Sequence, residues 1–65
     1  MARNETIYTP IIKKVQEEMD AITDYISSGR PKNFEEYQRL VGKMEGLSIA
    51  RELLQDTEKK FIDDS

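Results

Sequence analysis

A short break divides the chain into two helix-forming segments, and it limits the folds that the chain can adopt. Gly29 suits the position just past a helix end, where φ is often positive, and Pro31 prevents the helix from continuing. A connector over 29–33 is so short that the second helix must turn back along the first. We therefore expect an all-α fold, an antiparallel two-helix hairpin with helices over about 10–28 and about 34–61.

Capping residues mark where each helix begins. Thr9 followed by Pro10 suits an N-cap and a first helical residue. Asn33 with Glu36 three residues later forms a capping-box pattern. The domain boundaries that follow are a single domain over 1–65, an extended N-terminal arm over 1–8 and an acidic tail over 62–65.

Apolar residues predict one packing stripe on the first helix and two on the second. In the first helix a 3-4 spacing typical of a two-helix seam joins Ile12, Val15, Met19, Ile22 and Ile26. In the second helix one side carries Leu40, Met44, Leu47 and Leu54, and another carries Gly42, Gly46, Ile49 and Leu53. We interpret the leucine-rich side as facing the first helix and the glycine side as facing another chain, with the reverse assignment left open.

Two glycines inside a helix need a physical reason, because each costs about 1 kcal/mol relative to alanine. Gly42, Gly46 and Ala50 recur every four residues, so they form a strip that another backbone can approach closely. That backbone belongs either to a second chain or to the first helix of the hairpin. The predicted partner interface consists of Gly42, Gly46, Ile49, Ala50 and Leu53.

The size of the chain also favours a partner. Small domains usually gain stability from disulfides, metals or oligomerisation, and this chain has 65 residues with no Cys and no His. At 1.5 Å per residue the second helix is about 14 Å longer than the first. The expected overhang carries Leu53, Leu54 and Phe61. We expect a coiled-coil-like homo-oligomer or a subunit docked on a larger protein.

Residues near the turn form a second candidate contact. Tyr and Arg are enriched where binding energy concentrates, and the predicted hot spot consists of Tyr25, Arg30, Phe34 and Tyr37. Core packing at the turn is an equally good explanation of these residues. Arg51 lies on the apolar side, where its stem can cover apolar surface or its head can pair with an acid of a partner.

Several function classes are disfavoured. The adjacent acids point about 100° apart on a helix, so they do not converge on one substrate, and no nucleophile–base set is present. We expect no enzyme activity, no catalytic residues, no cofactor and no metal. Basic residues are scattered and the net charge is −3, which disfavours nucleic acid as a partner. No membrane span and no signal peptide are expected.

The segment Tyr37-x-x-Leu40-Val41-Gly42-x-Met44-x-Gly46-Leu47, after a first amphipathic helix and a Ser-Gly break, resembles small uncharacterised two-helix proteins of tailed bacteriophages. The resemblance covers roughly residues 12–58 and leaves out the first eight residues. It implies a viral origin and a non-enzymatic role, and it assigns no functional residues.

These observations give two functional hypotheses. The first is a protein–protein interaction module that serves as a small structural or assembly accessory of a tailed bacteriophage, in the virion or its head–tail machinery. The alternative is a small acidic phage inhibitor that binds and blocks a host enzyme or a defence protein. Either protein would be located in the host cytoplasm or the virion.

Overall fold

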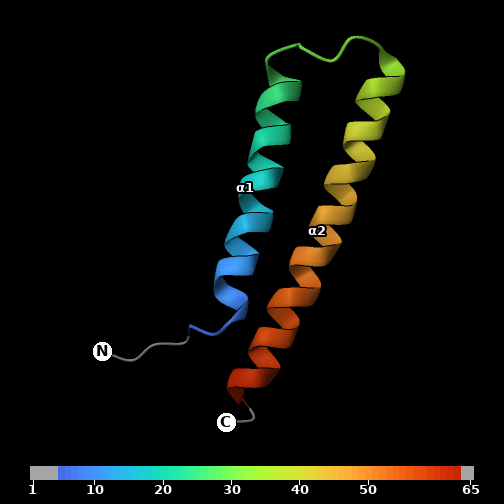
Figure 1. Ribbon diagram of the computed structural model, residues 1–65. Helices are drawn as coiled ribbons and strands as arrows, with labels where there is room; N and C mark the ends of the chain where they lie inside the picture. The colour runs from blue at the N-terminus through green and yellow to red at the C-terminus, as the bar shows by residue number, and fades with distance from the viewer. Residues whose placement is uncertain (1–4, 64–65) are drawn as a thin grey trace.

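The chain folds into two antiparallel helices that lie side by side (Figure 1). The computed structural model describes residues 5–63, in which α1 spans Tyr8–Ser27 and α2 spans Phe34–Asp63. The connector joins the helices at one end, and the start of α1 lies near the end of α2. The prediction of an all-α helical hairpin is therefore confirmed.

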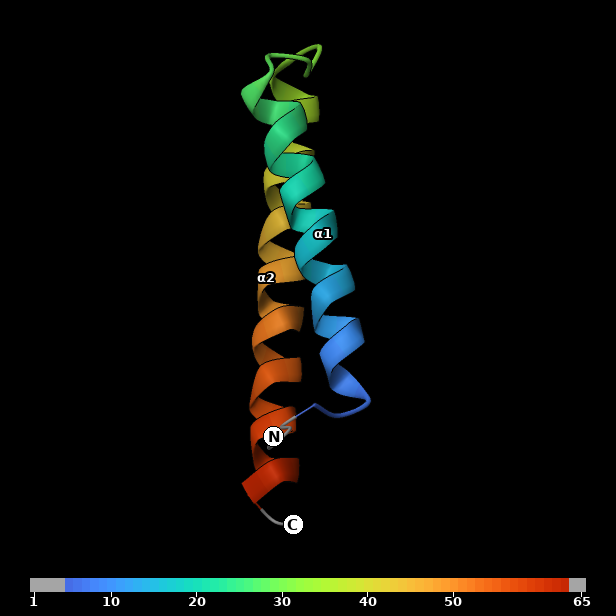
Figure 2. The same cartoon turned by 90° about the vertical axis from the view of Figure 1, so that its left-hand side faces the viewer.

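The hairpin is a single layer of helix. Its principal dimensions are 48 × 21 × 12 Å, and the smallest matches the diameter of one helix with its side chains. Figure 2 shows this layer edge-on, with α1 in front of α2. Among the described residues only Met19 and Ile22 are buried, both from the predicted stripe of α1. The other apolar side chains of the described residues are partly buried or exposed.

Local hydrogen bonds end α1 within one residue of the predicted end. Gly29 has a φ of +75°, its N–H donates to the Ile26 carbonyl at 3.1 Å, and the Arg30 N–H donates to the Tyr25 carbonyl at 3.5 Å. This is the Schellman arrangement, which uses a left-handed residue just past the helix to satisfy the last carbonyls. The helix ends at Ser27, one residue before the predicted end.

The start of α2 follows the predicted capping pattern with one difference. The Glu36 N–H donates to Asn33 Oδ1 at 2.8 Å, as an N-cap requires. The Glu36 side chain reaches beyond Asn33 and accepts from the Lys32 N–H at 2.6 Å. Its other oxygen accepts from the Tyr25 hydroxyl at 3.4 Å. The cap of α2 is thus also a contact with the last turn of α1.

The predicted start of α1 is wrong by two residues. Thr9 does not cap the helix; the Tyr8 N–H donates to Thr6 Oγ1 at 3.0 Å, and the Thr6 N–H donates to Thr9 Oγ1 at 3.1 Å. The N-cap position is Ile7, whose side chain makes no capping hydrogen bond, and the Thr6 hydroxyl satisfies the N–H of Tyr8 instead. Pro10 is tolerated because the first-turn N–H groups have no helical acceptor. The predicted arm over 1–8 is shorter than expected, since Tyr8 is helical and residues 1–4 lie outside the described residues.

The end of α2 also differs from the predicted boundary. The helix continues to Asp63, so Ile62 and Asp63 are helical instead of lying in a tail, and residues 64–65 lie outside the described residues. The end of α2 does extend past the start of α1 (Figure 1). It is not bare, because the Tyr8 ring meets the Phe61 ring edge-on at 6.2 Å.

A polar clamp joins the open ends of the hairpin. Glu58 Oε2 accepts hydrogen bonds from the hydroxyls of Thr6 and Thr9, each at 2.6 Å. These bonds hold the pKa of the Glu58 carboxyl below its ordinary value of 4.5, against a smaller opposing effect of burial. A group whose pKa is lower in the folded state stabilises that state above its unfolded pKa. The stabilisation is lost as the pH falls through the folded pKa.

We predict that Glu58→Gln reduces the acid sensitivity of the hairpin. The wild-type free energy of unfolding should fall as the pH drops below about 4.5, because protonation of Glu58 weakens both threonine hydrogen bonds. Urea unfolding at neutral pH and at several pH values below 4.5 measures this. Glu17→Gln, at an exposed site on α1, is the control and should keep the wild-type slope. Equal slopes for all three proteins would contradict the prediction.

Candidate protein-interaction surface

Two rows of residues with alternating spacings of three and four run along opposite sides of α2. The inner seam is the row that faces α1, and its members are partly buried: Leu40, Met44, Leu47, Arg51, Leu54 and Glu58. The outer seam is the opposite row, and its members are all exposed: Glu35, Arg39, Gly42, Gly46, Ile49, Leu53, Asp56 and Lys60. The structure thereby decides the assignment that the sequence left open, with the leucine-rich side toward α1.

Arg51 acts within the hairpin. Its Nη1 donates a hydrogen bond to Gln16 Oε1 on α1, and Gln16 Nε2 donates in turn to Asp20 Oδ1 at 2.9 Å. This chain of polar groups crosses the middle of the interface between the helices. The guanidinium therefore has a partner on α1, and a second chain is not needed to explain this arginine on an apolar seam.

The outer seam carries apolar side chains that the hairpin leaves in water. Ile49 is 57% exposed and Leu53 is 62% exposed. Ala50, which the sequence places in the same interface, is partly buried at the edge of the seam. Covering an isoleucine or leucine side chain fully is worth roughly 1.5–3 kcal/mol. A partner on this side would gain that contribution, and α1 cannot supply it.

The glycines of the outer seam are not required by the hairpin. A Cβ atom placed on Gly42 or on Gly46 would meet nothing within 4 Å, apart from the backbone of the helix itself. A close crossing of α1 and α2 at these glycines, one of the two explanations that the sequence allowed, is therefore wrong. The glycines leave a shallow strip that is open to a second backbone.

Four charged residues extend this surface beyond the interface that the sequence predicts. Glu35 and Arg39 precede the glycines, and Asp56 and Lys60 follow Leu53, all with the same spacing of three and four residues. A search for apolar residues alone misses them. The continuation of the spacing across charged positions is the signal that identifies them, because a seam is defined by its period and not by its polarity.

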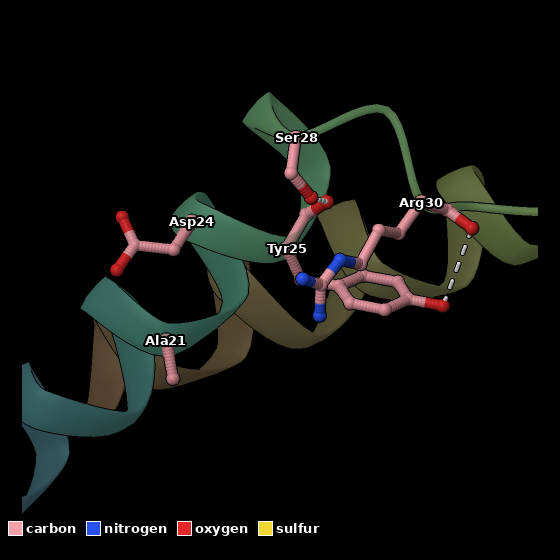
Figure 3. A pocket seen from close by; sticks show the side chains of 5 residues that line it. All are labelled: Ala21, Asp24, Tyr25, Ser28 and Arg30. Carbon is pink, nitrogen blue, oxygen red and sulfur yellow. Dashed lines mark hydrogen bonds between the residues drawn. The ribbon is translucent and has the colours of Figure 1, made fainter.

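The predicted hot spot divides into two pairs. Tyr25 and Arg30 line a shallow hollow at the turn with Ala21, Asp24 and Ser28 (Figure 3). The single proton of the Tyr25 hydroxyl is shared between the Arg30 carbonyl at 3.5 Å and Glu36 Oε2 at 3.4 Å. Tyr25 is partly buried, so its main contacts hold the connector against the ends of both helices. This pair fits the packing explanation that the sequence analysis considered beside the hot spot.

Phe34 and Tyr37 form the other pair, at the start of α2. Their rings stack with centroids 6.2 Å apart, yet Phe34 is 68% exposed and Tyr37 is 42% exposed. They line a shallow groove that continues along α2 past Val41 to Gly42. These two rings therefore lie on a flank of α2 between the inner and the outer seam, and the structure does not join them to Tyr25 and Arg30.

The acidic pairs do not form a site within the described residues. Glu17 and Glu18 are both exposed, while the Glu36 side chain accepts from the Lys32 N–H and its neighbour Glu35 is exposed. No group of three or more acidic side chains in residues 5–63 is arranged to hold a metal ion. In the same part of the chain, neither helix is long and apolar enough to cross a membrane.

We predict that Gly42→Ala and Gly46→Ala each stabilise the isolated hairpin. Alanine is favoured over glycine in a helix by about 1 kcal/mol, and the added methyl group meets no neighbour. Urea unfolding, at concentrations where sedimentation shows a monomer, should give a free energy of unfolding higher by about that amount. A loss of stability under these conditions would show that the hairpin itself needs the glycines.

Comparisons with known proteins do not assign the chain to a family. No family model, no curated protein and no solved structure matches it. The resemblance of the Tyr37–Leu47 segment to small phage proteins therefore stays a prediction from the sequence. The functional interpretation rests on the geometry of α2.

Proposed function

We propose that the protein is a non-enzymatic protein–protein interaction module that binds its partner through the outer seam of α2. One observation carries the proposal: α2 has seams on two opposite sides, and α1 covers one of them. A helix with apolar residues on two opposite sides gains stability from a neighbour on each side. The neighbour that would cover Ile49 and Leu53 has to come from outside the hairpin, because α1 lies on the opposite side.

The glycines support the same proposal. Gly42 and Gly46 lower the stability of α2 by about 1 kcal/mol each, and no contact within the hairpin compensates for this loss. A small protein has little stability to spare. This strip of small residues lowers the stability of the free chain but lets a second backbone approach closely. Such a loss of stability is expected at a surface that binds a partner.

The biological setting that we propose is the assembly of a tailed bacteriophage, in the virion or in the host cytoplasm where particles are built. This part rests on the resemblance of the Tyr37–Leu47 segment. Mass spectrometry of purified particles of the virus that encodes the chain tests it. Presence in particles supports a structural or assembly accessory, whereas absence from particles and from assembly intermediates supports the alternative, an inhibitor of a host enzyme or defence protein.

We predict that Gly46→Leu prevents assembly while leaving the chain helical. The leucine side chain would occupy the space that the partner backbone needs, yet a Cβ at this position meets no neighbour in the hairpin within 4 Å, apart from the backbone of the helix itself. Far-UV circular dichroism reports helicity, and sedimentation or incorporation into particles reports assembly.

Gln55→Leu is the matched control, because Gln55 is exposed on α2 but lies outside the outer seam. It adds the same apolar side chain and should assemble as wild type does. Normal assembly of Gly46→Leu would overturn the outer seam as the binding surface.

A further inference from the structure

The outer seam has the same spacing in both directions along α2. Its eight positions are symmetric about the point between Leu47 and Ser48, which pairs each residue in the first half with one in the second. The pairs, from the outside inward, are Glu35 with Lys60, Arg39 with Asp56, Gly42 with Leu53, and Gly46 with Ile49. Every pair joins residues that complement each other in charge or in size.

We propose that the partner on the outer seam is a second copy of this chain, whose α2 packs antiparallel against the first across a two-fold axis. The inference rests on the proposed binding function and names the partner. A two-fold axis brings residue i of one copy opposite residue j of the other, and j opposite i. With the axis between Leu47 and Ser48, these four pairs become contacts between the two copies.

The central layers of this pairing match large side chains to small ones. Gly46 faces Ile49 of the second copy, and Gly42 faces Leu53 of the second copy. In an antiparallel helix pair such layers place one large side chain over one small residue. The glycines let the helices approach closely, and Ile49 and Leu53, both more than half exposed in the single hairpin, lose their contact with water.

The outer layers match opposite charges. Glu35 faces Lys60 of the second copy, and Arg39 faces Asp56 of the second copy, and each contact occurs twice because of the symmetry. All four side chains are exposed in the hairpin, so they are available to a partner. Ion pairs at the ends of an apolar seam fix register and orientation more than they add affinity.

A parallel pairing of the same seam is unfavourable. Each charged residue would then face the same residue of the second copy. Glu35 would lie against Glu35 and Arg39 against Arg39, with the same repulsion at Asp56 and Lys60. The Ile49 and Leu53 layers would hold the two helices apart, so the layers in which glycine faces glycine would leave a void. Both charge and volume therefore select the antiparallel arrangement.

Charge reversals test the register. Arg39→Asp places like charges together at two symmetric contacts, and Asp56→Arg does the same with cations. Sedimentation equilibrium should show wild type at twice the 7.6 kDa chain mass and each variant dimerising at least about tenfold more weakly. An equimolar mixture of the two variants should regain a dimer, because both contacts then join opposite charges. The double variant R39D/D56R should regain it alone.

Lys14→Asp makes the same change in net charge on the exposed side of α1 and should dimerise as wild type does. A wild-type chain that stays monomeric at all concentrations overturns self-pairing. It leaves the binding function intact if Gly46→Leu still abolishes incorporation into particles. A dimer that is insensitive to Arg39→Asp overturns the antiparallel register.

Glu45 offers a substitution that should strengthen the dimer, whereas the charge reversals weaken it. The proposed pairing brings Glu45 beside Glu52 of the second copy at the edge of the seam, where like charges repel. We predict that Glu45→Lys tightens the dimer about threefold or more, because it replaces two repulsions with two attractions. Unchanged or weaker dimerisation in the same sedimentation assay would contradict the arrangement.

A carbodiimide cross-link provides an independent measure of orientation. Glu35 and Lys60 lie 25 positions apart on one helix, a distance of about 37 Å, so an amide between them within one chain is impossible. The antiparallel dimer should yield a Glu35–Lys60 linkage between chains, identified by mass spectrometry of the digested dimer band. A dimer band that lacks this linkage would overturn the pairing.

Discussion

The contact between α1 and the inner seam of α2 is the interaction on which the rest of the structure depends, because a hairpin of two helices has no second layer. Met19 and Ile22 are the buried side chains of the described chain, and both lie on the face of α1 that meets α2. A protein domain usually encloses its core between packed layers. Here one layer provides a core only along the line where the two helices touch, so every other surface of α2 remains open.

Polar contacts fix the register of α1 against α2 at three positions along the interface. Near the connector, Glu36 accepts from the Lys32 N–H and also contacts Tyr25 on α1. In the middle, Arg51 reaches Gln16. At the open end, Glu58 accepts from two threonine hydroxyls. Apolar side chains at heptad spacing can slide by a full repeat without a large loss of contact, whereas these directional bonds form in one register only.

The same register determines which side of α2 faces water. Once the inner seam is set against α1, the opposite row of residues is exposed along the whole helix, glycines included. The hairpin holds this row on a rigid helix about 37 Å long between Glu35 and Lys60. A preorganised surface loses little conformational freedom on binding. The fold thus presents a straight, exposed seam that has no neighbouring helix within the hairpin.

The sequence by itself determined the local parts of this structure. The periodicity of the apolar residues, Gly29 at a positive φ and Asn33 as a cap all act within one or two turns of helix, so both helices and the connector could be predicted. The two rows of α2 could be predicted as well, since a period needs no tertiary information. The full extent of the outer seam was missed only because its ends are charged.

Tertiary structure decided what depends on residues far apart in the chain. Thr6 and Thr9, on either side of the start of α1 at Tyr8, both bind Glu58, about fifty positions away. The side of α2 that faces α1 and the open space above Gly42 and Gly46 were likewise settled only by the packing of the helices. A sequence pattern states that two faces exist, but only the position of the neighbouring helix decides which of them is covered.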